Sequence, residues 1–369
     1  MDNRLQVLAV EPFFGGSHRQ FLEWVSQISR HQWTLVTDVP VHWKWRMRYS
    51  PLLLANKTRD VCSNGYRPDA LFCTDMLDLP SYRGLLRDAR LSQTPTLIYF
   101  HENQWTYPVA PGARVDHHYG YTNLLSAIAA DKVVFNSQFH RTDFLSASLR
   151  FLQNMPDGID AHDLEAIAQK SDVIPPGFSP PNSSFVRKEN GPLTVGWVAR
   201  WEHDKRPDQF LSLLQKLEEI HDDWRLVLLG PRPQQGCAEL DEISNRFSRR
   251  IDFNGYAQSH EDYWRWLNEI DVVVSTADHE YFGIAVCEAI WSGAIPVLPN
   301  RLSYPELTVK DCLYDDLEDA VAKVLELRDE SRRIALRVAC RDRIGRFVIQ
   351  QTVDELDNAI SAFVRSCPA

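Results

Sequence analysis

Two carboxylates, Glu280 and Glu288, bracket seven residues within the stretch 279–293, HEYFGIAVCEAIWSG. The stretch opens with aromatic residues and a glycine, and from Ile284 onward its apolar character predicts a buried helix. A buried carboxylate is costly unless the protein neutralises it or uses it to hold a polar ligand. The pair therefore indicates either two internally satisfied acids or a site for a ligand that is rich in hydroxyl groups.

The start of this predicted helix is a candidate anion site. Phe282, Gly283 and Ile284 would present main-chain N–H groups there, and a helix N-terminus attracts negative charge. Glu288 would lie about one turn into the helix and could accept the hydroxyls of a ribose, while Glu280 would reach those of a second sugar. The alternative makes Glu280 a helix-capping acid and Glu288 part of a solvated face, although apolar neighbours make exposure of Glu288 hard to arrange.

Two cations precede this pair by about 75 residues in the sequence. Arg200 and Lys205 lie in VARWEHDKRPDQF (198–210), directly after a predicted strand. An arginine can bind phosphate oxygens through two N–H groups and a lysine adds a mobile charge, so the two together suit a diphosphate. The alternative is a pair of solvated surface cations, which is the usual fate of both residue types.

A third strand end lies at FNGYAQSH (253–260). Main-chain groups of Tyr256 and Ala257 could contact the edge of a nucleobase there, although an ordinary turn between strand and helix explains the same pattern. Taken together, the three segments predict a ligand made of a base, a ribose, a diphosphate and a hexose, which is a nucleotide-sugar.

The first half of the chain has two comparable polar segments. EPFFGGSHRQF (11–21) follows the first predicted strand, and Gly15 and Gly16 permit a tight turn whose N–H groups could face the donor diphosphate. His101 opens a polar cluster, HENQ, after a later strand, and it could contact the reacting sugar or serve as a structural histidine. Neither segment is a GxGxxG dinucleotide fingerprint.

A basic and aromatic segment, VHWKWRMRYSPLLLANKTR (41–59), has five Lys or Arg residues and no acid. Lys44, Arg46 and Arg48 alternate with Trp43, Trp45 and Tyr49, a composition that can bind phosphates and stack on unpaired bases. The alternative is a solvated loop that its tryptophans anchor to the core. The net charge of -10 does not favour nucleic-acid binding overall, although it permits a local basic surface.

The apolar pattern of the sequence predicts the strands and helices that would position these segments. Strand-like runs alternate with helical patterns in both halves of the 369 residues, which predicts an α/β protein with two Rossmann-like parallel sheets. The Pro-, Gly- and Ser-rich stretch 174–192 is the expected linker. We expect an N-terminal domain over 1–180, a C-terminal domain over 181–350, and a last helix over 351–369 that packs back on the N-terminal domain.

Several classes of protein are not favoured by the sequence. No run of about 18 apolar residues predicts a membrane span, and the N-terminus lacks a signal-peptide core. The seven cysteines are scattered without a CxxC pair, which favours reduced thiols and a cytoplasmic location. The spacing of His, Cys and Asp indicates no metal site, and no Asp-x-Asp loop is present to hold a metal-bound donor.

The order of Arg200, Lys205 and the Glu280-x7-Glu288 pair resembles the donor site of retaining GT-B glycosyltransferases of family 4 over most of 190–300. The resemblance implies two Rossmann-like domains facing across a cleft, with Arg200, Lys205, Glu280 and His101 as catalytic residues and no metal cofactor. It also implies that Gly15, Gly16 and the main chain at 256–257 and 282–284 contact the donor, together with Glu288.

The segments EPFFGGSH, HWKWRMR and FHENQWTYP resemble a narrower group, the tRNA-queuosine α-mannosyltransferases. This resemblance implies transfer of mannose from GDP-mannose to the cyclopentenediol of queuosine in a tRNA anticodon, without a membrane or an obligate protein partner. Residues assigned to the acceptor are Ser17, His18, Trp43, Lys44, Arg46, Arg48, Glu102, Asn103 and Gln104. Two alternatives stay open, namely a glycan, lipid or small-metabolite acceptor, and a nucleotide-sugar binder without catalysis.

Overall fold

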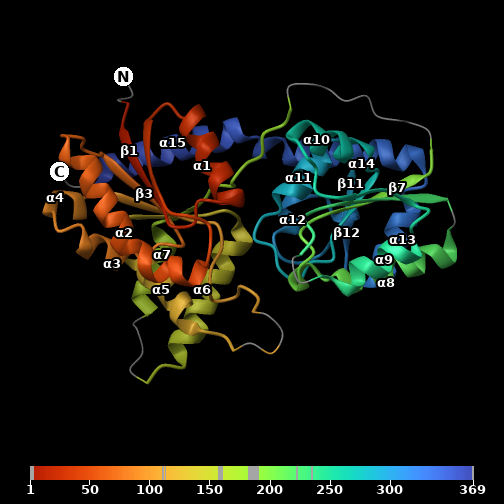
Figure 1. The fold of residues 1–369 in the computed structure, drawn as a ribbon, viewed down its shortest axis with the longest axis horizontal. Helices are drawn as coiled ribbons and strands as arrows, with labels where there is room; N and C mark the ends of the chain where they lie inside the picture. The colour runs from red at the N-terminus through yellow and green to blue at the C-terminus, as the bar shows by residue number, and fades with distance from the viewer. Residues whose placement is uncertain are drawn as a thin grey trace. The chain divides into compact units, whose positions relative to one another are not determined.

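The computed structural model describes residues 4–109, 112, 114–156, 161–181, 191–221, 223–233 and 236–367. Its chain folds into two compact units (Figure 1). The N-terminal unit comprises Met1–Gly177 together with Ile349–Ala369, and the C-terminal unit comprises Phe178–Val348. Part of the expected linker, residues 182–190, lies outside the described residues.

The N-terminal unit is built on a parallel six-stranded sheet in the order β2-β1-β3-β4-β5-β6. Strands β3 and β4 are buried along their whole length, as expected of a sheet that has helices on both faces. Its elements are β1 (Gln6–Glu11), α1 (Gly16–Ile28), β2 (Gln32–Thr37), α2 (Trp43–Ser63), β3 (Ala70–Thr74), α3 (Leu79–Leu85), α4 (Ala89–Ser92), β4 (Thr96–Phe100), α5 (His117–Ala129), β5 (Lys132–Phe135), α6 (Gln138–Gln153), α7 (Ala161–Gln169), β6 (Ser171–Val173) and α15 (Ile349–Ser366).

The C-terminal unit has a second parallel six-stranded sheet, in the order β12-β11-β10-β7-β8-β9. Its strands are β7 (Leu193–Val198), β8 (Trp224–Leu229), β9 (Ile251–Gly255), β10 (Val272–Val274), β11 (Ile295–Pro299) and β12 (Leu313–Tyr314). Its helices are α8 (Pro207–Ile220), α9 (Ala238–Arg246), α10 (His260–Glu269), α11 (Ile284–Trp291), α12 (Tyr304–Leu307), α13 (Leu317–Glu326) and α14 (Glu330–Ile344), with 3-10 turns at His203–Lys205, Lys310–Cys312 and Gly345–Phe347. The sequence-based expectation of two α/β halves is confirmed.

The helical C-terminal segment of the chain is interrupted. α14 ends at Ile344, and the 3-10 turn that follows places Phe347 in the core of the C-terminal unit. α15 then belongs to the N-terminal unit, where Figure 1 shows it, in blue, beside α1. Its Asp357 accepts hydrogen bonds from Ser29 Oγ at 2.6 Å and from the main-chain N–H of Arg30 at 2.8 Å. The tail therefore fastens the end of the chain to the first unit.

Helix α2 was not predicted as a helix, and the alternative of a solvated loop over 41–59 is wrong for most of this segment. Its buried residues include Met47, Leu54 and Ala55, but charged and aromatic side chains interrupt the apolar pattern that would reveal a helix. Pro51 lies inside the helix, where proline is normally unfavourable because it lacks a backbone N–H. Tertiary packing therefore overrides the local sequence signal in this segment.

Candidate functional site

The strand order of the C-terminal unit places a switch point between β7 and β10. From β7 the chain continues outward through β8 and β9, whereas β10, β11 and β12 extend to the other side. Ligands of open α/β sheets bind beyond the carboxyl ends of the strands at such a point. The loops that leave these two strands, 199–206 and 275–283, contain Lys205 and Glu280.

Lys205 lies at the centre of this arrangement. Its Nζ is 3.3 Å from Glu280 Oε2, 3.2 Å from Asp204 Oδ2, and donates to the carbonyl of His279 at 2.7 Å. Burial opposes the charge, but Glu280 and Asp204 outweigh it and raise the pKa of Lys205 above its ordinary value. The side chain is therefore a buried, permanently charged ammonium, and the alternative of a solvated surface cation is wrong for Lys205.

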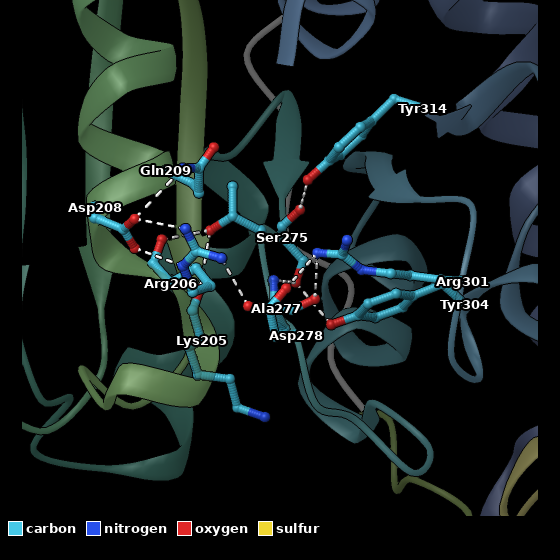
Figure 2. Close-up of polar contacts among 11 residues, drawn as sticks. Lys205, Arg206, Asp208, Gln209, Ser275, Ala277, Asp278, Arg301, Tyr304 and Tyr314 are labelled. Atoms are coloured by element: carbon cyan, nitrogen blue, oxygen red, sulfur yellow. Dashed lines mark hydrogen bonds and ion pairs between the residues drawn. The ribbon is translucent and has the colours of Figure 1, made fainter. Parts of the chain in front are cut away.

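The two loops are fastened to each other by polar contacts (Figure 2). Arg206 forms ion pairs with Asp208 and Asp278, both at 2.7 Å, and Arg301 reaches the other oxygen of Asp278 at 2.7 Å. Thr276 Oγ1 donates to the carbonyls of Lys205 and Arg206. In Figure 2 the Lys205 side chain extends away from this network, which therefore fixes its backbone and leaves its ammonium group to act elsewhere.

Helix α11 begins beside Lys205. Gly283, at its N-cap, has φ 104°, and a Cβ at this position would approach Leu307 Cδ1 to 3.1 Å, so the turn favours glycine. A small pocket of about 50 Å³ is lined by residues that include Lys205, Glu280, Gly283, Ile284 and Ala285. The cation, the carboxylate and the amide-rich helix start thus share one concave surface.

Phe282 is buried and packs edge-on against Phe347, with ring centroids 5.3 Å apart. Its side chain is therefore part of the core, and only its main chain remains for the donor contact that the sequence assigned to it. Ser303 Oγ donates to the Phe282 carbonyl at 2.9 Å and holds this main chain in place.

Glu288 lies in α11 and is 6% exposed, so the alternative of a solvated helix face is wrong. Its Oε2 accepts a hydrogen bond of 2.6 Å from the hydroxyl of Tyr263 in α10. Burial raises the pKa of Glu288 to about 7, against a smaller lowering by the Tyr263 hydroxyl. A carboxyl that is short of partners in this way is suited to accept further hydroxyl groups.

The remaining donor candidates are more exposed. Arg200 has a half-exposed side chain whose Nη1 lies 3.2 Å from Glu202 Oε1. Tyr256 follows β9 and is 74% exposed, and Ala257 is partly buried against the core of the unit. β9 is separated from β7 by β8, so the structure places these two residues farther along the same sheet edge than Lys205.

The N-terminal unit has its own switch point, between β1 and β3, since β2 lies on the other side of β1. Gly15 is the N-cap of α1, where a Cβ would come within 2.3 Å of Pro40 Cβ, and its N–H donates to the carbonyl of Phe13 at 2.9 Å. Gly16 has φ 53° and is exposed, as is Ser17. Packing thus requires a glycine at position 15, the positive φ favours one at position 16, and the Gly15 N–H already has a partner.

Buried titratable groups gather at this switch point. His18 of α1 is 6% exposed, and its Nδ1 lies 3.0 Å from Oε2 of Glu11 at the end of β1. The His18 ring packs against the ring of His101, which follows β4, with centroids 4.1 Å apart and planes tilted by 33°. Asp75 follows β3 and accepts the main-chain N–H of His101 at 2.8 Å. Three neighbouring strands thus contribute to one cluster.

Ligand atoms of Glu11, His18 and His101 lie within 4.8 Å of one another, a proximity that could suit a metal ion. However, the two rings are stacked and tilted by only 33°, so their in-plane lone pairs run side by side and do not converge on a single ion. The arrangement is better suited to a charged hydrogen-bonded pair beside a second imidazole.

The polar residues that follow His101 organise their own loop. Asn103 is fully buried, its Oδ1 accepts the Trp105 N–H at 3.1 Å, and its Nδ2 donates to Asp143. Gln104 Nε2 donates to Glu102 Oε1 at 2.8 Å. These three residues were assigned to the acceptor, and the structure places Asn103 inside the loop and Glu102 at partial exposure.

The assignment of Arg46 to an acceptor surface is wrong. Arg46 is buried, and its Nη1 pairs with Asp38 Oδ2 at 2.6 Å, so that the guanidinium fixes α2 to the end of β2. Trp43 is partly buried and packs edge-on against Tyr119 at 5.0 Å. The alternative in which tryptophan anchors the segment to the core therefore holds for Trp43.

The exposed face of α2 carries four of the basic and aromatic residues that the sequence singled out. Trp45 and Tyr49 are stacked on each other, with centroids 5.4 Å apart and planes 6° apart, and their exposed fractions are 55% and 38%. Lys44 and Arg48 are exposed beside them, each with its charge over the Tyr119 ring. The i, i+4 spacing of Trp45 and Tyr49 along the helix brings their two rings together.

Other residues of the two sites were missed because their roles depend on distant partners. Asp204 and His279 adjoin Lys205 and Glu280 in sequence, so their adjacency was the available signal. Tyr263, 25 residues before Glu288, carried no signal of its own, and neither did Asp75.

Comparisons with known proteins relate both units to glycosyltransferases. Residues 6–178 match the model of the tRNA-queuosine alpha-mannosyltransferase N-terminal family, and residues 181–337 match glycosyl transferases group 1. A tRNA-queuosine alpha-mannosyltransferase of Drosophila melanogaster is 35% identical over 320 residues, covering 84% of this chain and 83% of the relative. A GDP-mannose-dependent alpha-(1-6)-phosphatidylinositol dimannoside mannosyltransferase of Mycobacterium tuberculosis is 25% identical over 260 residues, covering 69% of this chain and 64% of the relative.

Solved structures show that the fold is GT-B. Anabaena HepE in complex with UDP-glucose superimposes with a TM-score of 0.67 at 16% identity, covering 97% of this chain and 100% of that chain. Sucrose-phosphate synthase from Thermosynechococcus elongatus gives a TM-score of 0.71 at 14% identity, covering 98% and 100%. No helix in the described part of the chain combines the length and apolar character that spanning a bilayer would require.

Proposed function

We propose that this chain, which belongs to the family of tRNA-queuosine alpha-mannosyltransferases, transfers mannose from GDP-mannose to the cyclopentenediol of queuosine in a tRNA anticodon. The chain is a glycosyltransferase. The choice of mannose and tRNA is supported by the Drosophila relative, and the choice of GDP by the printed name of the mycobacterial one. We place the reaction in the cytoplasm.

The observation that carries the donor side of this proposal is the Lys205–Glu280 pair at the switch point of the C-terminal sheet. Cleavage of the bond between the anomeric carbon and the phosphate oxygen leaves negative charge on the pyrophosphate. Lys205, Arg200 and the first amides of α11 would stabilise this charge from fixed positions, which is effective because a preorganised site needs no rearrangement during the reaction. Glu280 and Glu288 would hold hydroxyls of the sugar and the ribose, while the main chain at Tyr256 and Ala257 meets the base.

The acceptor hydroxyl then bonds to the anomeric carbon on the face that the phosphate leaves, and its proton passes to the departing phosphate oxygen. The configuration is thereby retained, and no protein nucleophile is needed. His101 would orient a hydroxyl of the reacting sugar. Since protein cations supply the positive charge, we expect transfer to continue in the presence of EDTA.

The proposal is tested by incubating the purified chain with GDP-mannose and queuosine-containing tRNA, followed by nucleoside digestion and mass spectrometry. Mannosylated queuosine is the expected product, and tRNA without queuosine is the matched control. Release of GDP without labelled nucleoside would point to a different acceptor, and GDP binding without turnover would point to a binding protein. UDP-glucose in place of GDP-mannose tests the choice of donor.

A further inference from the structure

The buried cluster at the switch point of the N-terminal sheet contains Glu11, to which the proposed reaction gives no role, and His18, which the sequence assigned to the acceptor. Glu11 is fully buried, and its two oxygens have separate partners. Oε1 accepts the main-chain N–H of Phe13 at 2.7 Å, and Oε2 faces His18 Nδ1 at 3.0 Å. Both side chains are buried, so each group depends on the other for compensation of its charge.

The ring of His101 is held between this pair and the core. Besides His18, it contacts the rings of Phe21 at 5.2 Å and Tyr99 at 4.7 Å. Its main chain is fixed at both ends, since Asp75 accepts its N–H at 2.8 Å and Asn136 Nδ2 donates to its carbonyl at 2.8 Å. The side chain therefore has little freedom to turn.

Nε2 of His101 is buried and has no hydrogen-bond partner among the described residues. An orphaned buried polar atom is costly, and such atoms tend to occur where a ligand supplies the missing partner. The ring therefore offers one nitrogen at a fixed position at the carboxyl ends of β1, β3 and β4.

We propose that Glu11 and His18 are positioning residues that act through His101: their ion pair holds a cation against the His101 ring and keeps that ring uncharged, so that Nε2 is set to bind one hydroxyl of the sugar substrate. This inference rests on the proposed function only for the identity of the hydroxyl. The ion pair and its effect on His101 are properties of the protein alone.

The charges around the cluster agree with this role. Burial opposes protonation of His18, but the charge and hydrogen bond of Glu11, with Asp75 and Glu102, raise its pKa to about 9. Burial, His18 and His140 lower the pKa of His101 well below 6.5. His18 is consequently the charged imidazole of the stack, and His101 is the neutral one.

The other titratable group that faces His101 behaves differently. Burial raises the pKa of Asp75 to about 8, with Glu102 and Glu11 adding to the rise and His18 opposing it. Its second oxygen, Oδ2, has no hydrogen-bond partner among the described residues. Titration of the cluster above neutral pH therefore includes both Asp75 and His18, whereas the acidic side of the profile reports His101.

The variant Glu11→Gln separates charge from structure. Its amide oxygen can accept the Phe13 N–H, and its NH2 group can donate to Nδ1 of a neutral His18, so both hydrogen bonds are retained while the charge is lost. Without Glu11, burial governs His18, which loses its proton near neutral pH. We expect the pKa of His101 to rise by about one unit or more, the shift that loss of a unit charge a few ångströms away gives.

The measurement is the pH titration of 15N-labelled histidine side chains by NMR, with the His101 signal assigned by its loss in His101→Gln. The titration is made without substrate, so it tests the effect of Glu11 and His18 on His101 even if no mannose transfer is found. Where transfer occurs, the acidic limb of kcat/KM should move upward by the same amount. Glu11→Gln/His18→Gln removes both charges and serves if the single variant fails to fold.

The matched control is His31→Gln, because His31 is also buried in the N-terminal unit but contacts Asp357 and Ser361 of α15. It should leave the His101 titration in place. The inference would be overturned if His101 had the same pKa in Glu11→Gln and in the unaltered protein. Stoichiometric metal in the purified protein, lost in His18→Gln, would do so too, because it would make His18 a metal ligand.

Discussion

The two sheets carry opposite chemistry at their switch points. In the C-terminal unit a buried ammonium, Lys205, lies beside the start of α11, with carboxylates as its partners. In the N-terminal unit a buried carboxylate, Glu11, is partnered by an imidazole that stacks on a second imidazole. Both sites use residues that follow strands on the two sides of a crossover, so the same topology supports either a cation or a neutral ring.

Under the proposed function, the charged Lys205 site and the neutral His101 ring would have different tasks in the transfer of mannose. In the proposed reaction a leaving pyrophosphate needs fixed positive charge, which Lys205 of the C-terminal site would provide. A sugar hydroxyl is better held by a neutral, directional group, and a charged neighbour can keep His101 in that form. The exposed aromatic and basic face of α2 adds a surface suited to unpaired bases.

Loss of the Lys205 charge is expected to have the largest effect on activity. Lys205→Met should lower kcat/KM by about a thousandfold or more, because removal of one fixed charge on the developing anion is typically worth this much. Rates of mannose transfer at saturating tRNA give the measurement. Lys216→Met is the control, since Lys216 is exposed on α8 and paired with Glu318. Near-normal transfer by a folded Lys205→Met protein would contradict the assigned role.

Arg46, the buried cation of the N-terminal unit, should affect stability and not the donor site. Arg46→Met leaves Asp38 buried without its partner and is expected to cost about 3 kcal/mol of the free energy of unfolding. Arg48→Met, on the exposed face of the same helix, should cost less than about 1 kcal/mol. Urea unfolding followed by tryptophan fluorescence compares the two, and equal losses would refute the distinction.

The stacked pair on α2 should affect the acceptor alone. Trp45→Ala is expected to weaken the binding of queuosine-containing tRNA about tenfold, the effect of losing one stacked base, while GDP binding stays unchanged. Fluorescence anisotropy with labelled tRNA gives the Kd. Ile334→Ala, at an exposed position of α14 in the other unit, is the control. An unchanged tRNA affinity would assign the aromatic pair to some other contact.

Glu288 should change the pH dependence of stability. Its pKa rises from 4.5 to about 7 on folding, so the stability it contributes is fully present below pH 4.5 and is lost as pH rises through 7. Glu288→Gln keeps an acceptor for Tyr263 and removes this loss. Above pH 7 the variant should be about 3 kcal/mol more stable than the unaltered protein, because each unit of pKa shift corresponds to about 1.4 kcal/mol.

Denaturant unfolding at several pH values measures this effect. If the free energy of unfolding changed with pH by the same amount in both proteins between pH 4.5 and 7, Glu288 would not be short of hydrogen-bond partners. The contrast with Glu11 is direct: among the described residues, Glu11 has a histidine opposite it, whereas the hydrogen-bond partner of Glu288 is the Tyr263 hydroxyl.

Most of the fold and the order of the donor segments could be read from the sequence. Apolar runs such as 193–198 and 96–100 became the strands β7 and β4, because burial of a strand on both faces requires apolar residues along a short local stretch. The polar segments after them were recognisable because parallel strands end at one edge. Helix α2 was the exception, since its packing does not follow a simple apolar period.

The sequence by itself determined which residue types stand at each strand end, because those patterns are local. Only the tertiary structure decided that Lys205 is buried against Glu280, that Arg46 belongs to Asp38, and that Glu11, His18 and His101 form one cluster. These contacts join residues from separate strands and loops, and the strand order that brings them together comes from the packing of the whole sheet. Burial then sets their charges, because a group's pKa depends on partners that its own sequence neighbours do not reveal.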